Sequence, residues 1–214
     1  REGFWVGRSG AQPGQEAGLV PAASRPAVNY IMPDPAQSPR AVVSLRKARE
    51  GDALLLSQLG ARLFEQAFGS ANDPEDMRAH LARVFSVEAQ RAELNDGDRA
   101  IWIAEDAGRA AVGYAMLRRG ITVDGVAGEK PAEVQRIYVE RAWHGQGVGE
   151  ALMRACVEHA TNVWHADVIW LGVWEKNPRA IAFYEKAGFH IVGRQTFVLG
   201  SDVQQDFVMA RPLR

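Results

Sequence analysis

The sequence predicts a mixed α/β domain whose elements follow the order β-α-α-β-β-β-α-β-α-β-β. Three observations favour this class. Apolar residues recur at helical spacing in several segments. Residues 167–174 ("DVIWLGVW") form an almost continuous apolar run, as in a strand buried on both faces. Short turn sequences, "AGR" at 107–109 and "GSD" at 200–202, each separate two strand-like segments of this 214-residue chain.

Residues 1–40 differ in composition from the rest of the chain. They hold six of the 10 prolines and five of the 21 glycines, and no stretch keeps a period of 2 or 3.6 residues. Such a segment buries too little surface to offset the entropy lost on ordering. We therefore expect a flexible Pro/Gly-rich N-terminal extension over 1–40, followed by one folded domain over 41–214.

A strand and two helices are expected before residue 100. Their ranges are 41–48, 52–68 and 73–85. The first helix carries leucines and Phe64 near helical spacing. In the second helix, Asp73 is suited to cap the amino end and Pro74 to occupy the first helical position.

Six strands and two helices are expected after residue 99. The strand ranges are 100–106, 110–119, 132–139, 167–174, 189–199 and 203–211. One helix follows a glycine-rich segment. Its apolar face consists of Val148, Ala151, Leu152, Ala155 and Cys156. The other helix begins at the capping residue Asn177, has Pro178 at its first position, and ends at Gly188.

The composition excludes several classes of protein. A net charge of −1 gives no basic field for nucleic acid, and no apolar run approaches the roughly 18 residues that span a bilayer. The single cysteine, Cys156, cannot form an intramolecular disulfide, and the five histidines show no metal-ligand spacing. We expect a cytoplasmic protein with no metal, no nucleic-acid partner and no membrane partner.

The segment "HGQGVG", His144 to Gly149, lies between a predicted strand and a predicted helix. The first N–H groups of a helix have no intrahelical partner and favour an anion such as phosphate. A P-loop requires Gly-Lys-Ser/Thr, and a dinucleotide fingerprint requires a different glycine spacing early in a βαβ unit. Two interpretations remain for the glycines alone: a pyrophosphate held by loop amides, or a tight turn without a ligand.

Two longer segments resemble the GNAT superfamily of acyl-CoA-dependent N-acyltransferases. They are "AEVQRIYVERAWHGQGVGEALM" and "WLGVWEKNPRAIAFYEKAGF", and the resemblance covers about residues 41–211. The family loop is [QR]-x-x-G-x-[GA], from which this chain departs only at His144. The second family segment is complete in Asn177, Ala180, Phe183, Tyr184, Gly188 and Phe189. The resemblance implies a single GNAT-like domain, with a mostly antiparallel sheet splayed at the cofactor site, and acetyl-CoA as the co-substrate.

The resemblance also assigns cofactor-binding positions. They are Ile137, Tyr138, Val139, His144, Gly145, Gln146, Gly147, Val148, Gly149, Glu150, Asn177 and Tyr184. In the family, loop amides bind the pyrophosphate, and the strand before the loop pairs with the pantetheine arm. Asn177 is expected both to cap its helix and to contact the cofactor.

Three residues are candidates for the chemistry of acetyl transfer. Glu133 stands where some family members carry a general base, although a solvated strand glutamate is the alternative. The backbone N–H of Ile137, opened by a bulge, is expected to bind the developing oxyanion. Tyr184 is the candidate acid for the leaving thiolate, or else a core tyrosine. Cys156 is expected to be a core residue and not an acyl carrier.

The acceptor is less well defined by the sequence. The first two helices and the final hairpin are expected to wall its site. Asp73, Glu75 and Asp76 either attract a cationic amine or complement the dipole of their helix. The stretch "GRQTFVLGSDVQQDFVMAR" resembles bacterial spermidine/spermine N-acetyltransferases, which suggests a polyamine or another small primary amine. A protein or peptide amine, a non-catalytic CoA-binding sensor, and a homodimeric assembly stay open.

Overall fold

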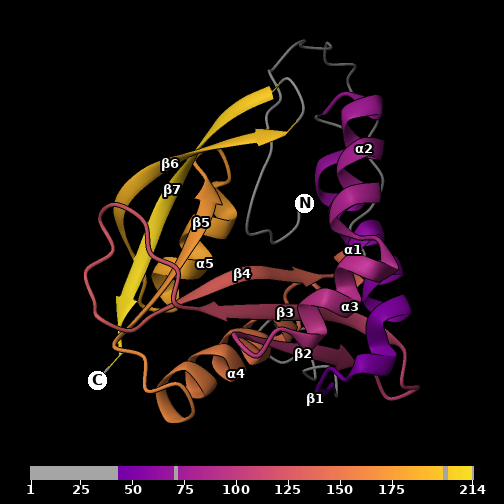
Figure 1. Ribbon diagram of the computed structural model, residues 1–214, viewed down its shortest axis with the longest axis horizontal. Helices are drawn as coiled ribbons and strands as arrows, with labels where there is room; N and C mark the ends of the chain where they lie inside the picture. The colour runs from indigo at the N-terminus through magenta and orange to yellow at the C-terminus, as the bar shows by residue number, and fades with distance from the viewer. Residues whose placement is uncertain (1–42, 70–71, 200–201, 214) are drawn as a thin grey trace, which may run out of the picture.

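A twisted sheet organises the domain in the computed structural model, which describes residues 43–69, 72–199 and 202–213 (Figure 1). Seven strands of the described chain follow the spatial order β1-β2-β3-β4-β5-β7-β6. All neighbours are antiparallel except β4 and β5, which are parallel. The strands are β1 (Ser44–Lys47), β2 (Arg99–Glu105), β3 (Ala111–Arg119), β4 (Pro131–Val139), β5 (Val168–Trp174), β6 (His190–Leu199) and β7 (Asp202–Pro212). The predicted mixed, mostly antiparallel sheet is therefore confirmed, while the extension expected over 1–40 lies outside the described residues.

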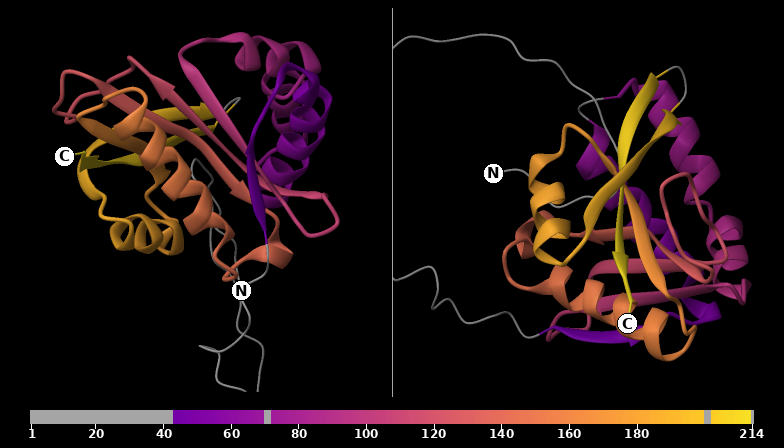
Figure 2. Two further views of the ribbon diagram at one scale, coloured as in Figure 1. Left: turned by 90° about the horizontal axis from the view of Figure 1, so that it is seen from below. Right: turned by 90° about the vertical axis from the view of Figure 1, so that its left-hand side faces the viewer.

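Helices cover both faces of the sheet (Figure 2). They are α1 (Ala53–Phe68), α2 (Pro74–Val84), α3 (Val87–Asn95), α4 (Val148–Asn162) and α5 (Pro178–Lys186). Helices α4 and α5 share one core with the sheet, and α1 contributes to a second core on the opposite face. The predicted caps are confirmed: Asp73 accepts the N–H of Glu75 at 2.8 Å, and Asn177 accepts that of Ala180 at 3.1 Å.

Helix α3 corrects the predicted element order, which had two helices before the second strand. Ser86 caps it by accepting the N–H of Ala89 at 3.1 Å. Only Gln90 of this nine-residue helix is buried, and its side chain donates to the carbonyl of Val84 at 2.9 Å. A helix that buries one polar residue has no apolar stripe, so hydrophobic periodicity does not detect it.

Strands β4 and β5 separate soon after they meet, as Figure 1 shows. Their pairing is Pro131↔Val168, Ala132↔Ile169 and Glu133↔Trp170, and no further pair joins them among the described residues. Beyond this point β4 stays paired with β3, and β5 stays paired with β7 along its whole length. The sheet therefore opens like a V, which confirms the expected splay.

Apolar side chains span the wide end of this opening. Leu199, at the tip of the β6–β7 hairpin, is buried in the same cluster as Leu63 and Phe64 of α1. Phe197 of β6 lies 6.3 Å, centroid to centroid, from His80 of α2. The helices and the hairpin thus meet across the gap and bound the space between the arms of the V on one side.

No helix in the described ranges is both long and apolar enough for a membrane span.

Candidate functional site

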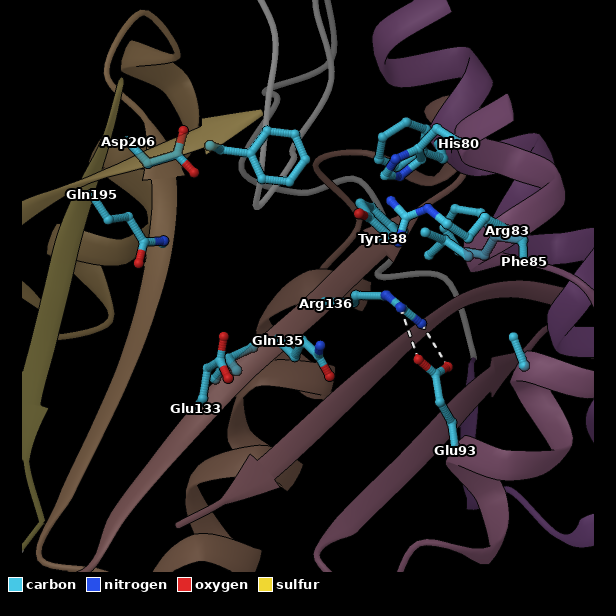
Figure 3. Close-up of a pocket in the computed structure, with 16 residues that line it drawn as sticks. His80, Arg83, Phe85, Glu93, Glu133, Gln135, Arg136, Tyr138, Gln195 and Asp206 are labelled. Carbon is cyan, nitrogen blue, oxygen red and sulfur yellow. Dashed lines mark hydrogen bonds and ion pairs between the residues drawn. The ribbon is translucent and has the colours of Figure 1, made fainter. Parts of the chain in front are cut away.

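A cavity of about 480 Å³ lies between the arms of the V (Figure 3). Helices α1, α2 and α3 and the β6–β7 hairpin contribute its walls, and β4 and β5 contribute its base. Six of its polar residues are His80, Arg83, Glu93, Glu133, Gln195 and Asp206. The expectation that the first helices and the final hairpin face one another across a site agrees with this geometry, and α3 adds a third helix.

Glu133 lies at the fork, because it is the last β4 residue that pairs with β5. Its side chain is 12% exposed and lines the cavity. Arg118, opposite it on β3, donates to Glu133 Oε2 from Nε at 2.8 Å and from Nη2 at 2.5 Å. Glu133 is therefore an oriented and ion-paired carboxylate, unlike a solvated strand glutamate.

A β-bulge at Gln135 follows directly after the fork. Met116 of β3 pairs with Arg136 and Leu117 pairs with Val134, so Gln135 is the extra residue. A bulge bends its strand and leaves local backbone groups outside the regular ladder. The bulge that was expected on this strand is therefore present, two residues before Ile137.

One network of ion pairs, in which Arg99 Nη1 also lies 3.6 Å from Glu93 Oε1, holds the bulge in place. Arg99 Nη1 donates to Gln135 Oε1 at 2.5 Å, and Arg99 Nε donates to Asp96 at 2.8 Å. Arg136 binds both carboxylate oxygens of Glu93, from Nη1 at 2.7 Å and from Nη2 at 2.9 Å. The Glu93 and Arg136 side chains are 14% and 10% exposed, and breaking a buried pair of this kind costs about 3–5 kcal/mol. Helix α3, which supplies Glu93, is therefore part of the support for β4.

The last residues of β4 leave one strand edge without a partner among the described strands. Ile137, Tyr138 and Val139 are each at most 4% exposed. Tyr138 lines the cavity, whereas Ile137 and Val139 belong to the core beneath α4. This alternation places one tyrosine in the cavity and leaves the backbone edge facing the opening of the V.

The glycine segment joins the end of β4 to α4 with two left-handed residues. Gly145 has φ 75° and Gly147 has φ 87°, a region that disfavours side chains. Gly147 is the N-cap of α4, and no side chain caps that helix. A Cβ on Gly145 would meet no atom within 4 Å, so the loop faces open space. The loop therefore presents helix N–H groups to a region with room for an anion.

Side chains of this loop shape its backbone. His144 Nε2 lies 2.8 Å from the carbonyl oxygen of Val139, and Gln146 Nε2 donates to the carbonyl of Ala142 at 2.7 Å. Burial lowers the pKa of His144, and Arg179 and Arg141 lower it further, while the hydrogen bond to Val139 opposes them. A neutral imidazole that donates from Nε2 fits this environment. His144 thus ties the loop to the end of β4.

Tyr184 and Cys156 lie in the core between the sheet and the helices α4 and α5. Tyr184 is 1% exposed, and its ring packs edge-on against Phe183 and Phe189. Burial, followed by the proximity of Tyr138 and Cys156, raises the pKa of Tyr184 well above its usual value. Tyr184 does not line the cavity that contains Glu133. Burial raises the pKa of Cys156 to about 12, so this thiol is a poor nucleophile, as expected of a core residue.

The acidic residues at the start of α2 lie away from the cavity. Asp73 caps the helix, Glu75 and Asp76 occupy its first turn, and none of the three lines the cavity. Their geometry is that of residues complementing a helix dipole. The cavity instead takes its α2 residues, His80 and Arg83, from beyond that first turn.

Several cavity residues were missed because they belong to separate elements. Two of them left a signal in the sequence. Asp206 points to the same buried face of β7 as Val208 and is 3% exposed. A carboxylate at such a core position is unusual. Gly172 interrupts the apolar strand β5, where a Cβ would stand 2.4 Å from Gln195 Nε2. Arg83 and Glu93 left no local signal.

Comparisons with known proteins agree with this geometry. The family model "Acetyltransferase (GNAT) family" matches residues 61–189, more than half of the chain. An uncharacterised N-acetyltransferase of Mycobacterium tuberculosis is 38% identical over 162 residues, covering 76% of this chain and 98% of that protein. A spermine/spermidine N(1)-acetyltransferase of Bacillus subtilis is 27% identical over 64 residues, covering 30% of this chain and 42% of that protein.

Solved structures show the same fold. The PaiA N-acetyltransferase of Thermoplasma acidophilum, crystallised with coenzyme A, superimposes with a TM-score of 0.62 at 19% identity. The match covers 80% of this chain and 99% of that protein. On the family model and the mycobacterial relative together, the chain belongs to the GNAT family of acetyltransferases.

Proposed function

We propose that this GNAT acetyltransferase moves the acetyl group of acetyl-CoA directly to the primary amine of a small molecule. One observation carries the proposal: β4 connects both halves of a two-substrate site. Its fork residue Glu133 lines the acceptor cavity, its outer edge faces the opening of the V, and its end leads into the glycine loop. A single strand can therefore align an amine on one side with a thioester on the other.

The residues present fit acetyl-CoA. The loop from His144 to Gly149 offers two left-handed glycines and an uncapped helix start, which suit the pyrophosphate. The free edge at Ile137–Val139 suits the amide groups of the pantetheine arm, which would add to the sheet as an extra strand. The cofactor roles of Gln146, Val148, Glu150 and Asn177 remain part of the same proposal.

The catalytic roles follow from the reaction. The amine nitrogen attacks the thioester carbon, the C–S bond breaks, one proton leaves the amine and one reaches the thiolate. Glu133 is proposed to receive the amine proton, directly or through water. The backbone N–H of Ile137, two residues after the bulge, is proposed to stabilise the oxyanion. Tyr184 is proposed as the acid that protonates the thiolate. Burial raises the pKa of this phenol, which keeps the proton on it at neutral pH but also makes it a weaker donor.

The first prediction concerns the glycine loop. Gly147→Asp should weaken acetyl-CoA binding by about 1–3 kcal/mol or more, because it adds a Cβ at φ 87° and a negative charge beside the pyrophosphate. Calorimetric titration measures the affinity. Gly120→Asp is the matched control. Gly120 also has a left-handed backbone, with φ 76°, but it follows the end of β3 that lies far from the glycine loop, and a Cβ there meets nothing within 4 Å. Equal affinities for the two variants would remove the pyrophosphate assignment.

The second prediction concerns the acid. Tyr184→Phe keeps the ring and removes the proton, so kcat should fall by roughly 10²–10⁴-fold with little change in melting temperature. Tyr138→Phe, which removes a hydroxyl from the cavity instead of the core, should cost less. Steady-state rates of CoA release measure both variants. A Tyr184→Phe enzyme with the wild-type kcat would return this residue to a packing role.

The third prediction concerns the base. Glu133→Gln keeps the size of the side chain but cannot accept a proton, so turnover should fall and the rise of kcat/KM with pH should flatten or move. Glu158→Gln, an exposed change on α4, is the control. A pH profile of unchanged shape, together with a raised KM for the amine, would make Glu133 an amine-binding residue held by Arg118 and would exclude it as the base.

A further inference from the structure

We infer that the acceptor is a zwitterion, a small molecule that carries a primary amine and a carboxylate on an apolar or aromatic body. This inference rests on the proposed acetyl transfer and names the class of its amine substrate. It comes from the distribution of charge within the cavity, whose two sides differ in sign (Figure 3).

The side formed by β5, β6 and β7, together with Glu133 of β4, is acidic and polar. Glu133 and Asp206 both line it, and Asp206 is only 3% exposed. Gln195 lies beside Asp206 because the two residues are paired across β6 and β7. Gly172 makes room for Gln195, since a Cβ there would lie 2.4 Å from Gln195 Nε2, and it leaves Asp206 Oδ2 at van der Waals distance, 3.6 Å. The carboxylate of Asp206 and the amide oxygen of Gln195 side by side suit an ammonium group.

The side formed by α2 is basic. Arg83 of α2 lines the cavity opposite Asp206, and within the described ranges no carboxylate lies within 4 Å of its guanidinium. The second arginine of the cavity, Arg136 of β4, is neutralised by its bidentate pair with Glu93 of α3. Arg83 is therefore the cation available to an anionic group of the acceptor, and a guanidinium binds carboxylates through paired donors.

Aromatic rings line the cavity between its two charged sides. The imidazole of His80 stacks on Phe64 with centroids 4.6 Å apart and meets Phe85 and Phe197 edge-on at 6.4 and 6.3 Å. Tyr138 completes this wall and lies edge-on to Phe64. Such a surface favours an apolar or aromatic body over an extended polar chain.

The same charges disfavour a polyamine. Two of the three carboxylates that line the cavity, Glu93 and Glu133, already bind arginines at 2.5–2.9 Å. A polycation would have to compete with both arginines and would also approach Arg83. Like charges in a confined site repel, and only a mono-amine avoids this repulsion.

The test compares amino carboxylates with their neutral amides. The purified full chain and acetyl-CoA are assayed with L-phenylalanine and 6-aminohexanoate, with the amide of each, and with spermidine. For at least one pair, kcat/KM for the carboxylate should exceed that for the amide by tenfold or more, and it should also exceed that for spermidine. Arg83→Gln should bring the carboxylate-to-amide ratio close to one. Arg78→Gln, an exposed change on the same helix outside the cavity, should keep the wild-type ratio.

Two outcomes would overturn the inference while leaving acetyl transfer intact: spermidine as the best acceptor, or a carboxylate preference that survives Arg83→Gln. If no amine is acetylated, the proposed function fails, and binding then decides the inference. Calorimetric titration of the CoA-loaded protein should show the carboxylate binding at least tenfold more tightly than its amide in the wild type but not in Arg83→Gln. Equal binding of carboxylate and amide to the wild type would reject the zwitterion.

Discussion

The separation of β4 from β5 is the constraint on which the rest of the structure depends. The two parallel strands pair only as far as Glu133 and Trp170, yet both continue. Backbone N–H and C=O groups at an unpaired edge need partners, so a split inside a sheet is costly unless something occupies it. We propose that the substrates occupy this split. The proposed base, the oxyanion donor and the glycine loop all lie along β4, in that order.

Ion pairs keep the split in a fixed shape. Along β4, three side chains are held by charged residues of other elements. They are Glu133, bound by Arg118, Gln135, bound by Arg99, and Arg136, bound by Glu93. Buried charged groups are stable only when they are paired and hydrogen-bonded. The cavity is lined by charges of both signs, most of which are already paired with one another or with Arg118. We propose that the network that shapes the bulge also limits which amines fit beside it.

Local signals predicted most of the fold and part of the site. Asp73, Asn177 and Gly188 define helix ends through chemistry that acts within a few residues, and the apolar strand β5 is visible in composition alone. Helix α3 has a capping residue, Ser86, but no apolar stripe, because it buries only Gln90. The cavity wall could not be predicted either. Arg83 and Asp206 lie more than 120 positions apart in sequence, and only the tertiary fold brings them to opposite sides of one cavity.

Hydrogen exchange of individual backbone amides, measured with and without CoA, tests the central claim that the open edge of β4 is a binding surface. If β4 beyond the fork receives the pantetheine arm, exchange in the segment 137–139 and in the loop 145–149 should slow when CoA binds. Strand β2, which lies away from the split and is paired on both sides, should change little. Protection confined to other parts of the molecule, with 137–139 unchanged at saturating CoA, would contradict the account.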